Sequence, residues 1–329
     1  MDDLTPRLLV DLLRDHIIPD KSLGQHFLLD KKVISRSIEM CTEEGYPINS
    51  KSRVLEIGPG PGSLTLFLLR SKANVVGIEI DQEAVSHLER VFASENSKLE
   101  IISGDALRLN WPNNLTHIVA NLPYQISSPT LDKIQQYHTE SPLQVIVLLV
   151  QDEFAERMSM EHFGSLSPLG LSLWLDFDVK LDKKVPGGAF SPAPRVNSRL
   201  VSLIPVDRTK ENGMIHRKMF KIITQHCFSS RRKKIRTLLS QVPRRISRIN
   251  GWHKSRWKLA VADLLANPPG LFSDDWFDNR PDMLEPEEWA IITNRISSYL
   301  SLIHISEPTR PERIGEARVG VKKKTGGGG

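Results

Sequence analysis

The chain has 329 residues, of which 40% are hydrophobic and 25% are charged, and it carries a net charge of +5. This length predicts one large domain with a smaller one beside it. The two cysteines, Cys41 and Cys227, lie far apart and outside any metal-ligand spacing. We therefore expect a reducing compartment, no disulfide framework and no bound metal.

The N-terminus carries acids where a targeting leader would carry basic residues. The longest apolar stretch, residues 145–150, is too short to span a bilayer. These two features predict a cytoplasmic protein that does not enter a membrane.

Short β-branched strands alternate with helical segments along the first two-thirds of the chain. A largely helical start is broken at residues 19–24. Strands are then expected at residues 53–57, 74–80, 99–102, 117–120 and 143–150, with helices at 63–72 and 82–93 and a closing strand near 201–204. This alternation predicts the α/β class, with a parallel, doubly wound, Rossmann-like sheet that helices cover on both faces.

The composition changes after Pro205, where the chain becomes helical, basic and tryptophan-containing. We expect a large domain at residues 1–205, a smaller helical domain at 206–300, and a disordered or non-native tail at 301–329. Residues 212–262 hold fourteen Lys and Arg but no Asp or Glu. Charge of one sign on this scale indicates a polyanionic partner, most commonly nucleic acid.

A glycine-rich loop, residues 58–62, follows the first strand and opens a helix. This arrangement serves nucleotide-type cofactors, although a tight structural turn has the same composition. Pro59 and Pro61 lack the backbone donors that a phosphate cradle needs. Glu56, at the loop entrance, would repel a pyrophosphate but can contribute to binding the cationic amino-acid portion of S-adenosylmethionine. The loop therefore favours this cofactor over a nicotinamide.

Two acids follow the next two strands. Glu79 ends the second strand, where a carboxylate can accept both ribose hydroxyls of an adenosine, or can simply be a solvated acid. Asp105 follows the third strand. It either accepts a hydrogen bond from the adenine amine of the cofactor or caps a helix.

The fourth strand leads into a tetrad, Asn121, Leu122, Pro123 and Tyr124. An adenine amine is a poor nucleophile because its lone pair is delocalised into the ring. The Asn121 side-chain carbonyl and a backbone carbonyl, both accepting from that amine, favour a tetrahedral nitrogen whose lone pair faces the methyl donor. Pro123 makes the backbone rigid, and Tyr124 offers a stacking face to a flipped-out base. The tetrad therefore predicts methylation of an adenine amine.

These motifs resemble, in order and approximate spacing, those of the small-subunit rRNA adenine dimethyltransferases. The similarity covers nearly all of residues 21–290. The matching segments are residues 21–28, 54–65, Glu79, 104–107, the tetrad, 151–157, 190–198 and 228–233.

The resemblance implies an S-adenosylmethionine-dependent enzyme of ribosome biogenesis. Its substrates would be the exocyclic amines of two adjacent adenosines near the 3′ end of small-subunit rRNA, within an immature subunit that a monomer binds. The residues implied to contact the cofactor are His26, Leu28, Gly58, Glu79, Asp105 and Asn121. His26 stands where bacterial members commonly have Asn. Leu122 varies in the family, so that its backbone carbonyl is the functional group.

The resemblance also extends the site beyond the tetrad. Phe190 is expected to be a second stacking surface for the target base, or else a plug at the domain junction. A basic helix is expected to contact phosphates, or else to be a solvated helix face; its cations are Arg231, Arg232, Lys233, Lys234 and Arg236. Trp252 and Trp257 are expected in the core of the smaller domain.

Three alternatives remain open at this stage. A methyltransferase of the antibiotic-resistance type, acting on large-subunit rRNA, shares the glycine loop and the tetrad but lacks the 228–233 motif. A ribosome-assembly or transcription factor could keep the fold for binding alone, but the intact Asn121, Tyr124, Glu79 and Asp105 favour catalysis. A nicotinamide-dependent oxidoreductase is disfavoured by the prolines of the loop.

Overall fold

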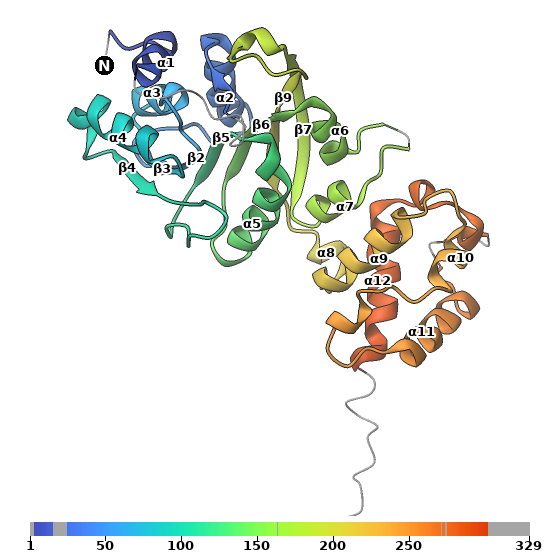
Figure 1. The fold of residues 1–329 in the computed structure, drawn as a ribbon. Coiled ribbons are helices and arrows are strands. Elements are labelled where there is room, and N and C mark those ends of the chain that lie inside the picture. The colour runs from blue at the N-terminus through green and yellow to red at the C-terminus, as the bar shows by residue number, and fades with distance from the viewer. Residues whose placement is uncertain (1–2, 16–24, 163, 271, 274, 302–329) are drawn as a thin grey trace, which may run out of the picture.

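The computed structural model describes residues 3–15, 25–162, 164–270, 272–273 and 275–301. The break expected at residues 19–24, the first four residues of the 21–28 motif and residues 302–329 of the expected tail lie outside these ranges. Figure 1 shows a sheet flanked by helices, followed along the chain by a group of helices at one side of it.

The described residues form a seven-stranded sheet in the order β4-β3-β2-β5-β6-β9-β7. The bounds are β2 (Arg53–Ile57), β3 (Asn74–Glu79), β4 (Leu99–Ser103), β5 (His117–Asn121), β6 (Val145–Gln151), β7 (Phe177–Val185) and β9 (Ser198–Pro205). The strands from β4 to β6 in this order run parallel. All five strands predicted before residue 150 are confirmed within one or two residues, and β9 is the predicted closing strand.

One edge of the sheet differs from the prediction. Strand β9 pairs antiparallel with both β6 and β7, so the sheet is not parallel throughout. The sequence pattern does not reveal β7, because exposed charges at Asp178, Lys180 and Lys184 interrupt its apolar residues. Charged side chains are typical of edge strands, where they prevent pairing with another chain.

Helices cover both faces of the sheet, as expected. Those in this part are α1 (Pro6–Arg14), α2 (Lys31–Glu43), α3 (Ser63–Arg70), α4 (Gln82–Val91), α5 (Ser127–Glu140), α6 (Asp152–Ser159) and α7 (Pro168–Trp174). Alternate strand residues enter two separate cores: Val54 packs with α2 and α3, whereas Leu55 packs with α5 and α6. This alternation follows from the two-residue period of a strand. The two-sided burial fixes the register of the sheet.

A second, two-stranded sheet lies outside the main one. Strands β1 (Phe27–Leu28) and β8 (Phe190–Ser191) pair antiparallel, with Leu28 opposite Phe190. This pairing brings the N-terminal segment next to a loop that lies more than 160 residues later, as the Leu28–Phe190 register shows. The short 3₁₀ turns among the described residues are η2 (Ala93–Glu95), η3 (Tyr124–Ile126), η4 (Gly187–Ala189), η5 (Ile246–Arg248), η6 (Trp276–Asp278) and η7 (Pro281–Met283).

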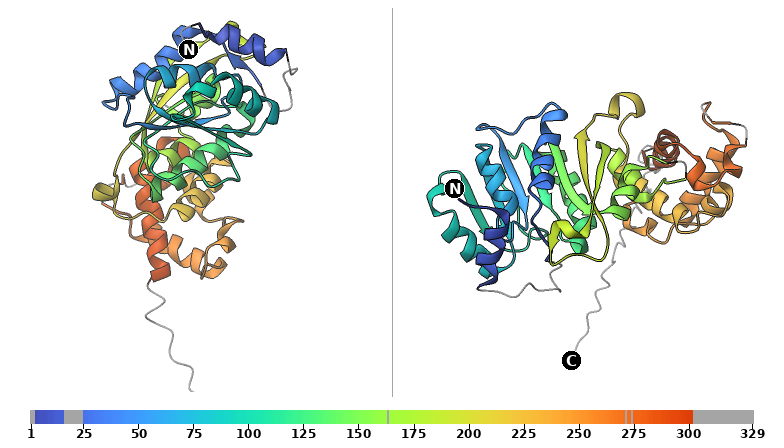
Figure 2. Two further views of the ribbon diagram at one scale, coloured as in Figure 1. Left: turned by 90° about the vertical axis from the view of Figure 1, so that its left-hand side faces the viewer. Right: turned by 90° about the horizontal axis from the view of Figure 1, so that it is seen from above.

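The C-terminal helices form a separate group (Figure 2). Their buried side chains make up a core of their own. They are α8 (Thr209–Asn212), α9 (Arg217–Phe228), α10 (Ile235–Leu239), α11 (Lys254–Ala266) and α12 (Pro286–Ser301). Trp252 and Trp257 are buried in this core, as predicted. Leu171 and Trp174 of α7 belong to the same core, so α7 attaches the helices to the sheet. We propose that the domain boundary lies near residue 206, between β9 and α8.

No helix in the described ranges is long and apolar enough to cross a membrane.

Candidate active site

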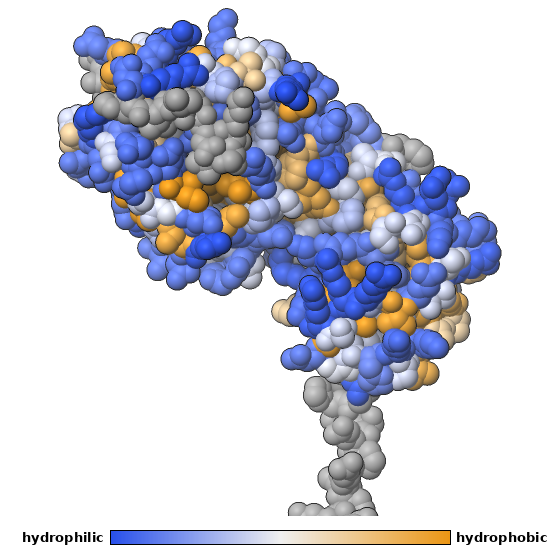
Figure 3. Space-filling model, viewed as in Figure 1, coloured by the Kyte–Doolittle hydropathy of each residue, from blue (hydrophilic) through white to orange (hydrophobic). Residues whose placement is uncertain are grey.

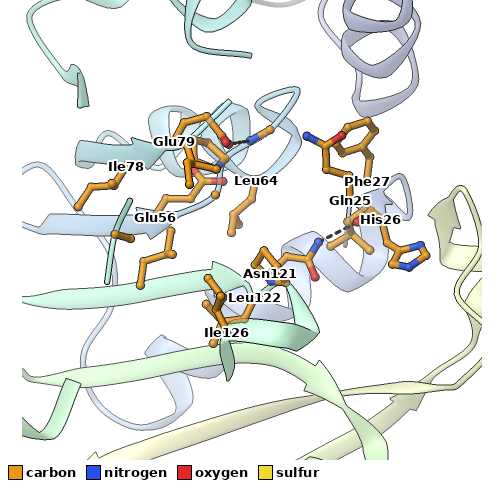
Figure 4. Close-up of a pocket in the computed structure, with 18 of the residues that line it drawn as sticks. Gln25, His26, Phe27, Glu56, Leu64, Ile78, Glu79, Asn121, Leu122 and Ile126 are labelled. Atoms are coloured by element: carbon orange, nitrogen blue, oxygen red, sulfur yellow. Dashed lines mark hydrogen bonds between the residues drawn. The ribbon is translucent and has the colours of Figure 1, made fainter. Parts of the chain in front are cut away.

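A cavity of about 1200 Å³, its open mouth included, lies at the carboxyl ends of the parallel strands. Its walls come from the loops that follow β2, β3, β4 and β5 and from the segment that contains β1 (Figure 4). Ligands of open α/β sheets bind at this edge. The sequence-predicted residues His26, Leu28, Gly58, Glu79, Asp105, Asn121, Leu122, Pro123 and Tyr124 all line this cavity.

Residues 58–61 of the glycine loop line the cavity. The glycines of this loop have backbone conformations that other residues rarely adopt. Gly58, Gly60 and Gly62 have φ values of 67°, 55° and 87°. A Cβ atom on Gly62 would lie 2.6 Å from the ring of Phe92. The loop therefore needs glycine for its turn and for close packing of α3 on α4.

Glu79 is held in place by the loop that it faces. Its Oε2 accepts a hydrogen bond from the Gly60 backbone N–H at 2.9 Å, and its Oε1 accepts from the Asp81 N–H at 2.9 Å. The side chain is 5% exposed, and burial raises its pKa above the usual range. Each oxygen keeps a further lone pair for a ligand hydroxyl.

Glu56 lies deeper in the same cavity. It is 2% exposed and accepts a hydrogen bond from the Thr65 hydroxyl at 2.6 Å. Burial, and to a smaller extent the charge of Glu79, raises the pKa of Glu56 to about 8. A carboxylate of this kind is strongly stabilised by a cation beside it, so the site is suited to an ammonium group.

Asp105 lies in a turn, so the helix cap that the sequence left open is not formed. Its Oδ1 accepts from the Leu107 backbone N–H at 2.9 Å, which closes a turn rather than capping a helix. Its Oδ2 lies 3.3 Å from Nε of Arg108. The same side chain lines the cavity and can accept from a ligand amine there.

Asn121 is oriented by the backbone of the N-terminal segment. Its side-chain Nδ2 donates to the carbonyl of His26 at 3.1 Å (Figure 4). This bond assigns the amide nitrogen to His26 and leaves the amide oxygen free to accept from a substrate amine. Leu122, the next residue, buries its side chain in the core.

Tyr124 is fixed at both its ring and its hydroxyl. The ring stacks on the imidazole of His26, with centroids 5.8 Å apart and an interplanar angle of 29°. The hydroxyl shares a hydrogen bond of 2.7 Å with Oγ of Ser198. Burial raises the pKa of Tyr124, so the phenol stays neutral. A ring held in this way is a preformed stacking surface.

His26 contributes its backbone, rather than its ring, to Asn121. Its Nδ1 lies 2.8 Å from the carbonyl of Pro192; because a carbonyl only accepts, Nδ1 carries the proton. The ring points away from Asn121 (Figure 4). The predicted cofactor contact of His26 stays a prediction.

Phe190 does not face the cavity in this conformation. It is 5% exposed and packs with Leu28 in the core that covers one face of the sheet. That core includes no residue of α8 to α12, so the alternative that Phe190 plugs the domain junction is wrong. Stacking of Phe190 on a base stays a prediction, which requires the ring to move.

The basic segment after α9 is a turn and not a helix. Arg231, Arg232, Lys233 and Lys234 are exposed residues between α9 and α10, and the surface around α10 is largely hydrophilic (Figure 3). The expectation of a basic helix is therefore wrong for these four residues, whereas Arg236 lies in α10. Phe228, at the start of this motif, packs against Trp289 in the core, with ring centroids 5.7 Å apart.

The acid-free stretch of sequence is not acid-free in space. Asp278 lies 3.2 Å from Nζ of Lys234 and 2.9 Å from Nε of Arg236. No ion pair between described residues involves Arg231, Arg232 or Lys233. Of the five cations that the sequence predicts to contact phosphates, these three therefore remain available to a polyanion.

Two residues of the site, Ser198 and Ile80, were not predicted from the sequence. Ser198, which holds the Tyr124 hydroxyl, stands in a recognised motif but follows Tyr124 by 74 residues. Ile80 lines the cavity and is 55% exposed, which is unusual for a large apolar residue. A signal exists only for Ile80, because it directly follows the strand-end acid Glu79.

The carboxyl groups of Glu56, Glu79 and Asp105 around one cavity, beside an amide whose oxygen can accept from an amine, fit an S-adenosylmethionine-dependent methyltransferase. The ribosomal RNA adenine dimethylase family matches residues 19–255. The chain therefore belongs to this family, and it is an S-adenosylmethionine-dependent rRNA adenine methyltransferase. Among the described residues, no group of His, Cys, Asp or Glu is arranged to hold a metal ion.

Known proteins of similar sequence and fold agree with this assignment. A probable ribosomal RNA small subunit methyltransferase A of Methanopyrus kandleri is 32% identical over 86% of this chain and 94% of its own. Its namesake in Methanospirillum hungatei is 33% identical over 83% and 98%. A dimethyladenosine transferase from Plasmodium falciparum has a similar structure, with a TM-score of 0.66, 26% identity and coverage of 83% and 98%. The 23S rRNA methyltransferase ErmE, at 24% identity and a TM-score of 0.57 over 82% and 99%, shares the fold.

Proposed function

We propose that this enzyme dimethylates the exocyclic amines of two adjacent adenosines near the 3′ end of small-subunit rRNA, within an immature subunit. The orientation of the Asn121 amide is the observation that carries this proposal, because it aims an acceptor into the cofactor cavity. The names of the relatives from Methanopyrus kandleri and Methanospirillum hungatei support the small subunit as the source of the RNA.

The residues present fit S-adenosylmethionine. Glu79 offers both carboxylate oxygens at a strand end, where ribose hydroxyls can donate to them. Glu56 offers a buried carboxylate to the amino-acid ammonium, and Asp105 can accept from the adenine amine. When bound, the cofactor supplies an electrophilic methyl group on a sulfonium.

The protein's part in the reaction is mainly positioning. The Asn121 side-chain oxygen accepts one amine hydrogen of the target base, and the Leu122 backbone carbonyl accepts the other. Both bonds favour a tetrahedral nitrogen whose lone pair is directed at the methyl group. Tyr124 holds the base by stacking, which is worth roughly 1–3 kcal/mol. As the new N–C bond forms, the methyl–sulfur bond would break and the positive charge would pass to the amine nitrogen. Because this cationic amine is strongly acidic, it loses its extra proton readily to water, and no strong general base is needed.

The cations of the α9–α10 turn support binding to RNA. Arg231, Arg232 and Lys233 are exposed and carry charges that no described acid neutralises. Phosphate contacts of this kind position a nucleic acid without reading its sequence. We further propose that the enzyme acts as a monomer in the cytoplasm; the two free, buried cysteines fit a reducing compartment.

Methyl transfer to purified ribosomal subunits tests the proposal. Wild-type protein should transfer labelled methyl groups from S-adenosylmethionine to unmethylated small subunits, and primer extension should stop at two adjacent adenosines near the 3′ end. The variant Asn121→Ala should lose the transfer but retain RNA binding. Methylation of large-subunit RNA alone would contradict the proposal.

A further inference from the structure

The loop between β8 and β9, residues 192–197, ends beside the tetrad but has no part in the proposed chemistry. Ala193, Arg195, Val196 and Asn197 are exposed on it. Val196 is 46% exposed, and few large apolar side chains of the described chain are as open to solvent. An exposed apolar residue beside a cation is a combination that suits RNA, which presents stacked bases and phosphates.

The first end of this loop is tied to the N-terminal segment. The Pro192 carbonyl accepts from Nδ1 of His26 at 2.8 Å. The preceding Ser191 hydroxyl accepts from Nη2 of Arg14 at 2.8 Å. Through His26, whose carbonyl accepts from Asn121, this end of the loop is connected to the amine-binding group.

The second end is tied to the tetrad and to α6. The Asn197 carbonyl accepts from the Asp152 N–H at 3.0 Å. Ser198 follows, is fully buried, and shares a hydrogen bond with the hydroxyl of Tyr124. A loop held at both ends loses little conformational entropy when it binds a ligand.

The charges around the loop leave Arg195 available. Asp152 is paired with Arg199 at 2.7 Å and with Lys184 at 2.6 Å, so its carboxylate does not attract Arg195. Within the described part of the chain, no ion pair involves Arg195. A cation in this state can contact a phosphate without first breaking an internal pair.

We propose that the loop binds the nucleotide next to the target adenosine, with Val196 packing against its base and Arg195 contacting its phosphate. Two extended residues span at most about 7 Å, so Val196 lies within one nucleotide's reach of Ser198 and the Tyr124 ring. The loop then acts as a second RNA contact, separate from the α9–α10 turn. This inference rests on the proposed function.

Site-directed cross-linking tests which nucleotide the loop touches. The native thiols of Cys41 and Cys227 are fully buried, and burial raises the pKa of Cys41 to about 12 and that of Cys227 further still. An azidophenacyl label on Val196→Cys would therefore react at one site in the full-length enzyme. Primer extension on unmethylated small subunits should map its cross-links to nucleotides that flank the methylated adenosines. Cross-links confined to other RNA regions or to ribosomal proteins would overturn the proposal.

Kinetics provide a second, independent readout. Arg195→Ala should raise the KM for small subunits roughly fivefold or more, and should lower the salt dependence of binding by about one phosphate contact. Lys51→Ala is the matched control, because Lys51 is exposed just before β2, at the opposite edge of the sheet. An unchanged KM for Arg195→Ala would contradict the role of the loop. Failure of the wild-type enzyme to methylate small subunits would instead contradict the proposed function.

Discussion

The side-chain amide of Asn121 donates to the backbone carbonyl of His26 at 3.1 Å, across 95 residues of sequence. The hydrogen bond that Nδ2 of Asn121 donates, and not only the acceptor oxygen of the same amide, should therefore matter for methyl transfer. The variant Asn121→Asp keeps an acceptor of the same shape but places a carboxylate against the His26 carbonyl. We expect kcat to fall at least about tenfold, because the loss of one such bond costs roughly 1–3 kcal/mol.

Single-turnover methyl transfer to unmethylated small subunits measures this effect. Asn121→Ala, which removes both functions, should be about 100-fold slower than wild type or worse. Asn96→Ala, an exposed amide at the amino edge of the sheet, is the control and should leave the rate unchanged. Full activity of Asn121→Asp would show that the bond to His26 is unimportant.

The hydrogen bond between Tyr124 and Ser198 should position the stacking ring. Tyr124→Phe and Ser198→Ala each remove the same 2.7 Å contact, so the double variant should be no worse than the more damaging single one. Each single change should reduce kcat/KM by roughly five- to tenfold, about 1 kcal/mol. Ser198→Thr, which keeps the hydroxyl, should restore part of the loss.

A double-mutant cycle on kcat/KM measures this coupling. The fluorescence of 2-aminopurine at the target position reports how the base stacks on Tyr124. A defect elsewhere in the structure would leave this fluorescence unaltered. Additive losses in the cycle would mean that the two residues act independently.

Much of the fold was accessible from the sequence because its signals are local. The parallel strands are short apolar runs, and the glycines of the loop have backbone angles that the residue type itself predicts. Glu79 and Asp105 can be identified because Glu79 ends one predicted strand and Asp105 comes just after the next. Strand β7 is not evident from the sequence, because its exposed charged residues interrupt the alternation of apolar and polar side chains.

The contacts that order the site are long-range, and no local pattern encodes them. Asn121 meets His26 across 95 residues of sequence, and Tyr124 meets Ser198 across 74. In the same way, Asp278 pairs with both Lys234 and Arg236 and offsets one of their two charges, although the sequence around these cations holds no acid. Charge counted along a chain therefore overstates the charge that a surface presents.

The stability of the ligand-free enzyme should fall as pH rises. Burial raises the pKa of Glu56 to about 8 in the folded protein, above the usual value of 4.5. Between these values the folded state holds a proton that the unfolded state has released, so each pH unit in the window reduces stability, by about 1 kcal/mol. Above about pH 8 the effect levels off. Glu56→Gln should flatten this dependence in chemical denaturation.

Cofactor binding should show the opposite trend through the same residue. The ammonium of S-adenosylmethionine is stabilised by ionised Glu56, so its affinity should rise from about pH 6 toward pH 8. Calorimetry in buffers of different ionisation enthalpy should detect proton release on binding at pH 7. An equally strong pH dependence in Glu56→Gln would assign the effect to another group.

The cations of the α9–α10 turn should differ in their importance for RNA binding. Arg231, Arg232 and Lys233 have no acidic partner among the described residues, whereas Arg236 is paired with Asp278 at 2.9 Å. We therefore expect the triple change of Arg231, Arg232 and Lys233 to Ala to raise the KM for small subunits at least about tenfold and to leave kcat little altered. The same change should reduce the slope of log affinity against log salt by about two to three. Arg236→Ala should have a smaller effect, because Asp278, which Arg236 shares with Lys234, already offsets part of its charge. Binding titrations at several salt concentrations measure both slopes, and equal effects of the two variants would refute the distinction between paired and unpaired cations.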